Sequence, residues 1–85
     1  MKQSALKCVY LLQSLRDPNR RYIGSTDDVD QRVVEHNAGK SPHTAKYVPW
    51  KLVVAIRFDN DAKAHAFERY PKQGSGHAFA RRHLW

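Results

Sequence analysis

Five side chains along this sequence could together cleave a phosphodiester bond. Tyr10 and Tyr22 supply phenols, each in a short β-prone run, and Arg32 supplies a planar guanidinium that matches the geometry of phosphate. His36 adds an imidazole, and far downstream Glu68 adds a carboxylate that could bind a metal ion. Such a set could transfer protons, hold a phosphate group and stabilise a leaving oxygen.

Arg32 and His36 have the spacing of neighbours on a helix. They are separated as i and i+4, which predicts that they share one helical face, turned away from Val29 and Val33. On that face Arg32 would hold the scissile phosphate through two parallel hydrogen bonds. His36 would hydrogen-bond the phosphate or hold a tyrosine. The alternative for both residues is an ordinary solvated polar face.

The phenols and the carboxylate also have simpler interpretations. Tyr10 and Tyr22 fall in neighbouring predicted strands, so both can face one surface, but two β-prone aromatic residues could equally fill a core. Glu68 could be a surface carboxylate that pairs with His65 or Lys72, each one helical turn away.

Charge is the strongest signal in the composition. The chain has 15 Lys and Arg residues against 8 Asp and Glu, a formal net charge of +7 and an isoelectric point near 9.9. This excess favours a polyanionic partner, and we expect DNA, with RNA as the alternative. Non-specific backbone contacts are predicted for Lys40, Lys46, Arg81 and Arg82, although each could simply be a solubilising charge.

Length and composition limit the remaining classes. A chain of 85 residues predicts a single domain over residues 1–85. Its one cysteine, Cys8, cannot form an internal disulfide or a cysteine-based zinc site. The longest apolar run, residues 52–56, is far short of the roughly 20 residues that cross a membrane. We therefore expect a cytoplasmic protein that does not bind membranes.

The hydrophobic pattern predicts an α+β fold, a small three-stranded, mainly antiparallel sheet flanked by helices, because three strands alone need helices to cover them. The predicted strands cover residues 7–14, 21–25 and 50–58. The predicted helices begin near residues 26–28, 43 and 59–61. The last of these would turn Ala62, Ala66, Phe67 and Tyr70 inward. Residues 74–76 would interrupt it before a final turn over residues 77–83.

The ordered set of motifs resembles the GIY-YIG nuclease superfamily. The first motif corresponds to Cys8-Val9-Tyr10 and the second is intact as Tyr22-Ile23-Gly24. Residues 24–37, which include Arg32, resemble the helix of that family, and Glu68 stands where the family has its acidic metal ligand. The end of the chain resembles small stand-alone members, which are related to the N-terminal nuclease domain of a bacterial excinuclease.

The resemblance implies a metal-dependent endonuclease that hydrolyses DNA phosphodiester bonds, with nicking related to repair or recombination. One of Tyr10 and Tyr22, and we expect Tyr10, would help to deprotonate the attacking water, and because a free phenol is a poor base, a guanidinium or metal would have to stabilise the phenolate. Glu68 would be the sole protein ligand of Mg²⁺ or Mn²⁺. Gly24, without a side chain, would let the nucleic-acid backbone or the helix of Arg32 approach.

The chain departs from the family pattern at Cys8, which replaces the opening glycine, a position where many members vary. Two other departures favour an alternative: Pro71 follows Glu68 closely and could end or kink its helix, and the asparagine that larger members have beyond the glutamate is missing. The alternative is a nucleic-acid-binding module of the same fold with little or no turnover. A nuclease that acts only when a protein partner recruits it is a further possibility.

Overall fold

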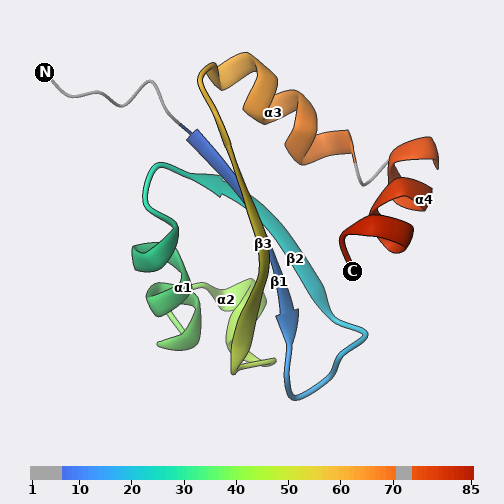
Figure 1. Cartoon of the computed structure of the whole chain (residues 1–85). Coiled ribbons are helices and arrows are strands. Elements are labelled where there is room, and N and C mark those ends of the chain that lie inside the picture. The colour runs from blue at the N-terminus through green and yellow to red at the C-terminus, as the bar shows by residue number, and fades with distance from the viewer. Residues whose placement is uncertain (1–6, 71–73) are drawn as a thin grey trace, which may run out of the picture.

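A three-stranded antiparallel sheet forms the centre of the protein (Figure 1). The computed structural model describes residues 7–70 and 74–85. The strands are β1 (Lys7–Ser14), β2 (Arg21–Thr26) and β3 (Trp50–Phe58), in the order β2–β1–β3. The predicted α+β class and the three-stranded antiparallel sheet are confirmed.

Four helices accompany the sheet in the part of the chain that the structure describes. In chain order they are α1 (Val29–Asn37), α2 (Pro42–Ala45), α3 (Asp61–Arg69) and α4 (Gly74–His83). Within the described residues, none of these helices combines the length and the apolar character needed to cross a membrane.

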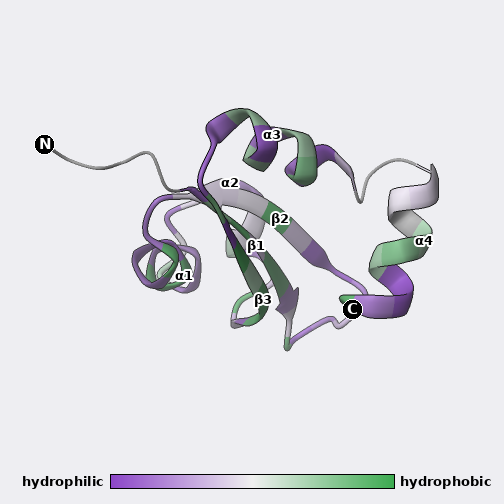
Figure 2. Cartoon of the chain, turned by 45° about the horizontal axis from the view of Figure 1, so that its top comes forward, coloured by the Kyte–Doolittle hydropathy of each residue, from purple (hydrophilic) through white to green (hydrophobic). Residues whose placement is uncertain are grey.

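The central strand β1 is buried on both faces. Its residues Val9, Tyr10, Leu11 and Leu12 are at most 1% exposed, which explains why this strand is a continuous apolar run rather than an alternating one. Figure 2 shows the same pattern in colour, with the most hydrophobic stretches in β1 and β3 between the helices. The sheet is therefore the middle of three layers.

The helices divide between the two faces of the sheet (Figure 1). Val9 and Leu11 point to one face and pack with Ala64 of α3. Their neighbour Tyr10 points to the other face, where its cluster includes Val29 and Val33 of α1. We call this second face, which carries Tyr10, Leu12 and Tyr22, the tyrosine face. The prediction that both tyrosines share one surface is confirmed.

The inner side of α3 differs from the prediction. Ala64 is fully buried and Phe67 packs edge-on against Phe58, with ring centroids 5.4 Å apart, whereas Ala62 and Ala66 are exposed. Alanine is almost equally acceptable on the buried and on the exposed face of a helix, so the spacing of the alanines could not reveal which of them faces the sheet. The aromatic pair decides the orientation.

The end of α3 also differs from the expected interruption at residues 74–76. The helix ends at Arg69, and Gly74–Gly76 form the first turn of α4. A Cβ atom on Gly76 would collide with the carbonyl of Tyr70, so this glycine allows α4 to pack closely against the end of α3. The effect predicted for Pro71 concerns a residue that lies outside the described part of the chain.

Asn37 connects the end of α1 to the start of β3. Its side-chain amide donates to the carbonyl oxygen of Trp50 at 3.1 Å and accepts from the Trp50 backbone N–H at 2.6 Å. The indole N–H of Trp50 in turn donates to the carbonyl oxygen of Thr44 at 2.8 Å. These three bonds hold α1 and α2 over the tyrosine face.

Replacing Asn37 with alanine should lower the free energy of unfolding by about 2 kcal/mol, because both backbone groups of the buried Trp50 lose their partner. Urea denaturation followed by tryptophan fluorescence would measure this change. As a control, Asn19→Ala, in the exposed turn between β1 and β2, should change the value by less than about 0.5 kcal/mol. Equal effects of the two substitutions would contradict the role of Asn37.

Candidate active site

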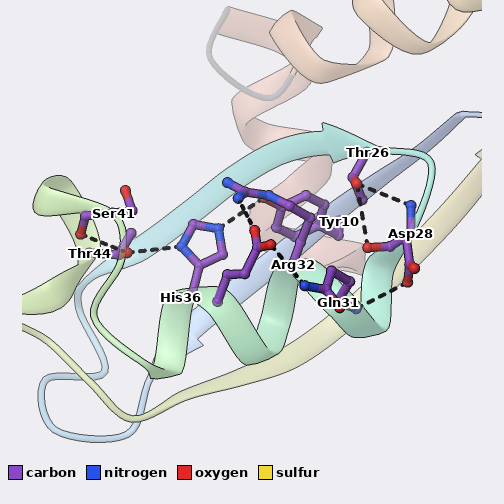
Figure 3. A network of polar contacts seen from close by, with 9 residues as sticks. Tyr10, Thr26, Asp28, Gln31, Arg32, His36, Ser41 and Thr44 are labelled. Carbon is purple, nitrogen blue, oxygen red and sulfur yellow. Dashed lines mark hydrogen bonds and ion pairs between the residues drawn. The ribbon is translucent and has the colours of Figure 1, made fainter.

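Three rings from three separate elements meet on the tyrosine face. They belong to Tyr10 of β1, Tyr22 of β2 and His36 of α1, with ring centroids between 4.8 and 6.1 Å apart. The Tyr10 hydroxyl lies 2.9 Å from Nε2 of His36 (Figure 3). Residues far apart in the sequence thus form one hydrogen-bonded aromatic cluster.

Gly24 creates the space in which the two phenols lie. It is the partner of Tyr10 across the β1–β2 pairing, and Tyr22 is the partner of Leu12. A Cβ atom at position 24 would lie 2.8 Å from the Tyr10 hydroxyl and 2.9 Å from the Tyr22 ring. The tyrosine rings themselves therefore occupy the room left by the missing side chain. A nucleic-acid contact at Gly24 stays a prediction.

His36 occupies the inner face of α1, and the predicted outward face is wrong for this residue. It is 0% exposed and follows Val29 and Val33 at i+7 and i+3, which completes one inward stripe at roughly 100° per residue. Its Nδ1 lies 2.9 Å from the Thr44 hydroxyl, so both ring nitrogens have partners. These bonds offset the cost of burying the imidazole.

Burial shifts the pKa values of the two hydrogen-bonded side chains, Tyr10 and His36, in opposite directions. It lowers the pKa of His36 below its ordinary value, and the nearby Arg32 guanidinium lowers this pKa further. Burial raises the pKa of the Tyr10 phenol, while Arg32 opposes that rise. At neutral pH the pair is therefore a protonated phenol beside a neutral imidazole.

Arg32 lies at the solvent side of the cluster. Its side chain is 35% exposed and forms an ion pair with Glu35, whose other oxygen accepts a hydrogen bond from Gln31 at 2.9 Å (Figure 3). These contacts lower the pKa of Glu35, through Gln31 first and Arg32 second. Tyr10 itself is only 1% exposed, and the Arg32 guanidinium lies beside it.

Glu68 belongs to the other face of the sheet. It is half-buried in the last turn of α3, the helix that packs on the face of the sheet opposite the tyrosine face. Among the described residues, no hydrogen bond or ion pair joins Glu68 to Tyr10, Tyr22, Arg32 or His36. A metal-binding role of Glu68 beside the cluster stays a prediction.

The predicted basic contacts lie in two places. Lys40 and Lys46 are exposed next to α1 and α2, on the side of the tyrosine face, whereas Arg81 and Arg82 are exposed in the last turn of α4. The sequence analysis missed Thr44, which meets His36 only because the chain turns at Gly39, with a φ of 78°, and returns through α2. No spacing rule along the sequence indicates that contact.

Comparison with known proteins identifies the family of this chain. Residues 6–80 match the family described as the GIY-YIG catalytic domain. The chain belongs to the GIY-YIG family. Two proteins named structure-specific endonuclease subunit SLX1 are similar to this GIY-YIG domain. The one from Candida dubliniensis is 36% identical over 83 residues, which is 89% of this chain and 28% of that protein. The one from Talaromyces marneffei is 36% identical over 70 residues, 75% of this chain and 18% of that protein.

The chain covers a larger share of a bacterial relative than of these two fungal proteins. A UPF0213 protein from Lactococcus lactis subsp. cremoris is 38% identical over 48 residues, which is 55% of this chain and 49% of that protein. The GIY-YIG domain described here therefore spans only part of the relatives that it matches.

Gly24→Ala should destabilise this GIY-YIG domain by about 1–3 kcal/mol, because the added methyl group overlaps both tyrosine rings. Thermal unfolding would measure the loss, and near-ultraviolet circular dichroism would report the displaced tyrosines. Gly74→Ala is the matched control, since a Cβ there meets nothing within 4 Å, and should change stability by less than about 1 kcal/mol. An unchanged stability of Gly24→Ala would contradict the close packing.

The lowered pKa of His36 predicts that stability falls on mild acidification. Below the ordinary value of 6.5 the unfolded state binds more protons at this position than the folded state, so the free energy of unfolding decreases as pH falls from 6.5 toward the folded pKa. The slope of the free energy of unfolding against pH should reach up to about 1.4 kcal/mol per pH unit. Urea denaturation between pH 5 and 7.5 would measure it. His36→Gln should remove this slope and the exposed-site control His43→Gln should keep it, whereas equal slopes in both variants would exclude His36 as the source.

Proposed function

We propose that this GIY-YIG domain is a metal-dependent endonuclease that hydrolyses DNA phosphodiester bonds and nicks branched or damaged structures in repair or recombination. The observation that carries the proposal is the buried hydrogen bond between Tyr10 and His36 with the Arg32 guanidinium beside it. The names of the relatives, which describe structure-specific endonuclease subunits, support the same class of reaction.

Arg32 would bind the scissile phosphate. Its ion pair with Glu35 uses one terminal nitrogen, which leaves other N–H groups of the guanidinium for a phosphate oxygen. Hydrogen bonds between two charged groups are about twice as strong as neutral ones, and they strengthen as negative charge develops on the phosphate. The partial exposure of Arg32 gives the substrate access to it.

Tyr10 and His36 would activate the attacking water together. The raised pKa of the phenol keeps Tyr10 protonated, so it cannot act alone as a base at neutral pH. As its oxygen takes a proton from water, its own proton would pass to Nε2 of the neutral His36 across the 2.9 Å hydrogen bond. The resulting hydroxide attacks phosphorus, the bond to the leaving oxygen breaks, and His36 is left as an imidazolium.

The residues of this chain fit a metal ion that the substrate helps to bind. Among the described residues there is no cluster of three or more His, Cys, Asp and Glu side chains that could bind a metal by themselves. Mg²⁺ commonly uses one or two carboxylates together with waters and substrate phosphates, so Glu68 alone suffices as a protein ligand. Nucleases of the GIY-YIG family are in general metal-dependent. When bound, Mg²⁺ or Mn²⁺ would supply charge stabilisation to the leaving oxygen.

A protein partner fits this proposal. The fungal relatives are named as subunits, and this chain corresponds to 28% of one of them and 18% of the other. We therefore propose that a partner directs the domain to its DNA substrate. The exposed basic residues Lys40, Lys46, Arg81 and Arg82 would add sequence-independent contacts to the backbone of DNA, or of RNA as the alternative substrate.

Nicking of supercoiled plasmid in Mg²⁺ or Mn²⁺, abolished by a chelator, would test the activity. Arg32→Ala should lower the rate at least about 100-fold, because it removes a preorganised donor to the phosphate. Glu68→Ala should abolish the metal-dependent reaction but leave DNA binding, measured by fluorescence anisotropy in a chelator, within about threefold. Arg16→Ala, in the exposed turn after β1, is the control and should keep nearly full activity.

The same experiment separates the alternative. DNA binding without any nicking, together with binding that is insensitive to Glu68→Ala, would indicate a nucleic-acid-binding module with no turnover. Faster cleavage of a single-stranded RNA than of plasmid would assign RNA as the substrate.

A further inference from the structure

The hydroxyl of Thr44 lies beside Nδ1 of His36, the ring nitrogen on the side away from Tyr10. Thr44 is 2% exposed, and its Oγ is 2.9 Å from Nδ1 of His36 and 3.5 Å from the carbonyl oxygen of Ser41 (Figure 3). Thr44 belongs to α2, not to the helix that carries His36. The indole of Trp50 holds the Thr44 carbonyl at 2.8 Å, so the position of this hydroxyl is set by the fold rather than by local sequence.

The phenol indicates which nitrogen of His36 carries the proton. The Tyr10 hydroxyl is buried, and its hydrogen-bond partner among the described residues is Nε2 of His36. The Arg32 guanidinium beside the phenol can only donate, so it cannot accept the phenol proton. An Nε2–H tautomer would leave the Tyr22 hydroxyl as the neighbouring acceptor for the buried phenol proton, in place of the 2.9 Å bond to His36. This geometry favours a Tyr10 that donates to an unprotonated Nε2, with the imidazole proton on Nδ1.

The contacts on the opposite side of the ring are compatible with the same tautomer. Nδ1–H must then donate to the Thr44 hydroxyl, which has one proton of its own and passes it toward the Ser41 carbonyl, a group that can only accept. In each of these three hydrogen bonds the donor then lies on the Tyr10 side: Tyr10 donates to His36, His36 to Thr44, and Thr44 to the carbonyl oxygen of Ser41. A hydroxyl that donates to a carbonyl one turn earlier in a short helix is a familiar arrangement for threonine.

We propose that Thr44 is a positioning residue for the reaction, which keeps His36 in the Nδ1–H tautomer and so leaves Nε2 free to accept the proton of Tyr10. This inference rests on the proposed nuclease function. Thr44 touches neither water nor phosphate in this mechanism and acts only through the imidazole. Without its hydroxyl, Nδ1–H would lose its acceptor, and the ring could adopt the Nε2–H tautomer, which cannot take a proton from the phenol.

Two substitutions separate the hydroxyl from the shape of the side chain. Thr44→Val keeps the shape and removes the hydroxyl, whereas Thr44→Ser keeps the hydroxyl and removes a methyl group. The tautomer of His36 is read from the ¹⁵N chemical shifts of its ring nitrogens in protein without DNA or metal. Wild type and Thr44→Ser should show Nδ1–H, and Thr44→Val should show Nε2–H or a mixture of both tautomers.

Nicking kinetics then test the link to the reaction. Thr44→Val should lower kcat at least about tenfold and change KM by less than about twofold, because the substrate-binding groups remain, and Thr44→Ser should restore kcat to within about threefold of wild type. An Nε2–H tautomer in the wild type, or a folded Thr44→Val with unchanged kcat, would overturn the inference. The wild-type spectrum needs no variant, so the tautomer is tested even if Thr44→Val fails to fold.

The two levels of the proposal can fail separately. A wild-type protein with the Nδ1–H tautomer but no nicking activity would refute the nuclease function, and with it a catalytic purpose for Thr44. A wild-type protein that nicks DNA with His36 in the Nε2–H tautomer would refute only the role assigned to Thr44.

Discussion

The hydrogen bond between Tyr10 and His36 is the constraint on which the rest of this structure depends. It joins the central strand to the helix that covers it, and both of its groups are almost completely shielded from water. A buried phenol and a buried imidazole each need a partner, so neither could occupy its place without the other. Gly24 leaves room for the phenol, and the Asn37–Trp50 bonds fix the helix at the distance that the pair requires.

Burial also gives this pair its chemical character. The same loss of hydration raises the pKa of the phenol and lowers that of the imidazole, since each group is most easily buried in its neutral form. A resting state with a protonated Tyr10 and a neutral His36 is therefore stable. Both shifts keep the proton on Tyr10 in this state, because each of them disfavours its transfer to His36.

The sheet lies between the polar cluster of Tyr10 and His36 on one face and an apolar core on the other. The face toward α3 is lined by aliphatic and aromatic side chains, among them Leu11, Ala64 and Phe67. On the tyrosine face, hydrogen bonds connect Tyr10, His36 and Thr44 and so join β1, α1 and α2. Glu68 belongs to α3, on the aliphatic side.

Local patterns in the sequence determined the elements of this protein. The apolar runs, the turn residues between β1 and β2, and the candidate caps at residues 26–28 and 59–61 predicted the strands and the starts of α1 and α3, because these signals act over a few neighbouring residues. The motif tyrosines and Arg32 were identified from the ordered set of motifs that resembles the GIY-YIG family. Only the tertiary structure decided that His36 points inward, that Ala64 rather than Ala62 faces the sheet, and that Thr44 lies behind the imidazole. Each of these depends on which surface another element covers. His36 does continue the helical stripe of Val29 and Val33, but the spacing of the alanines and the sequence around Thr44 do not reveal that long-range choice.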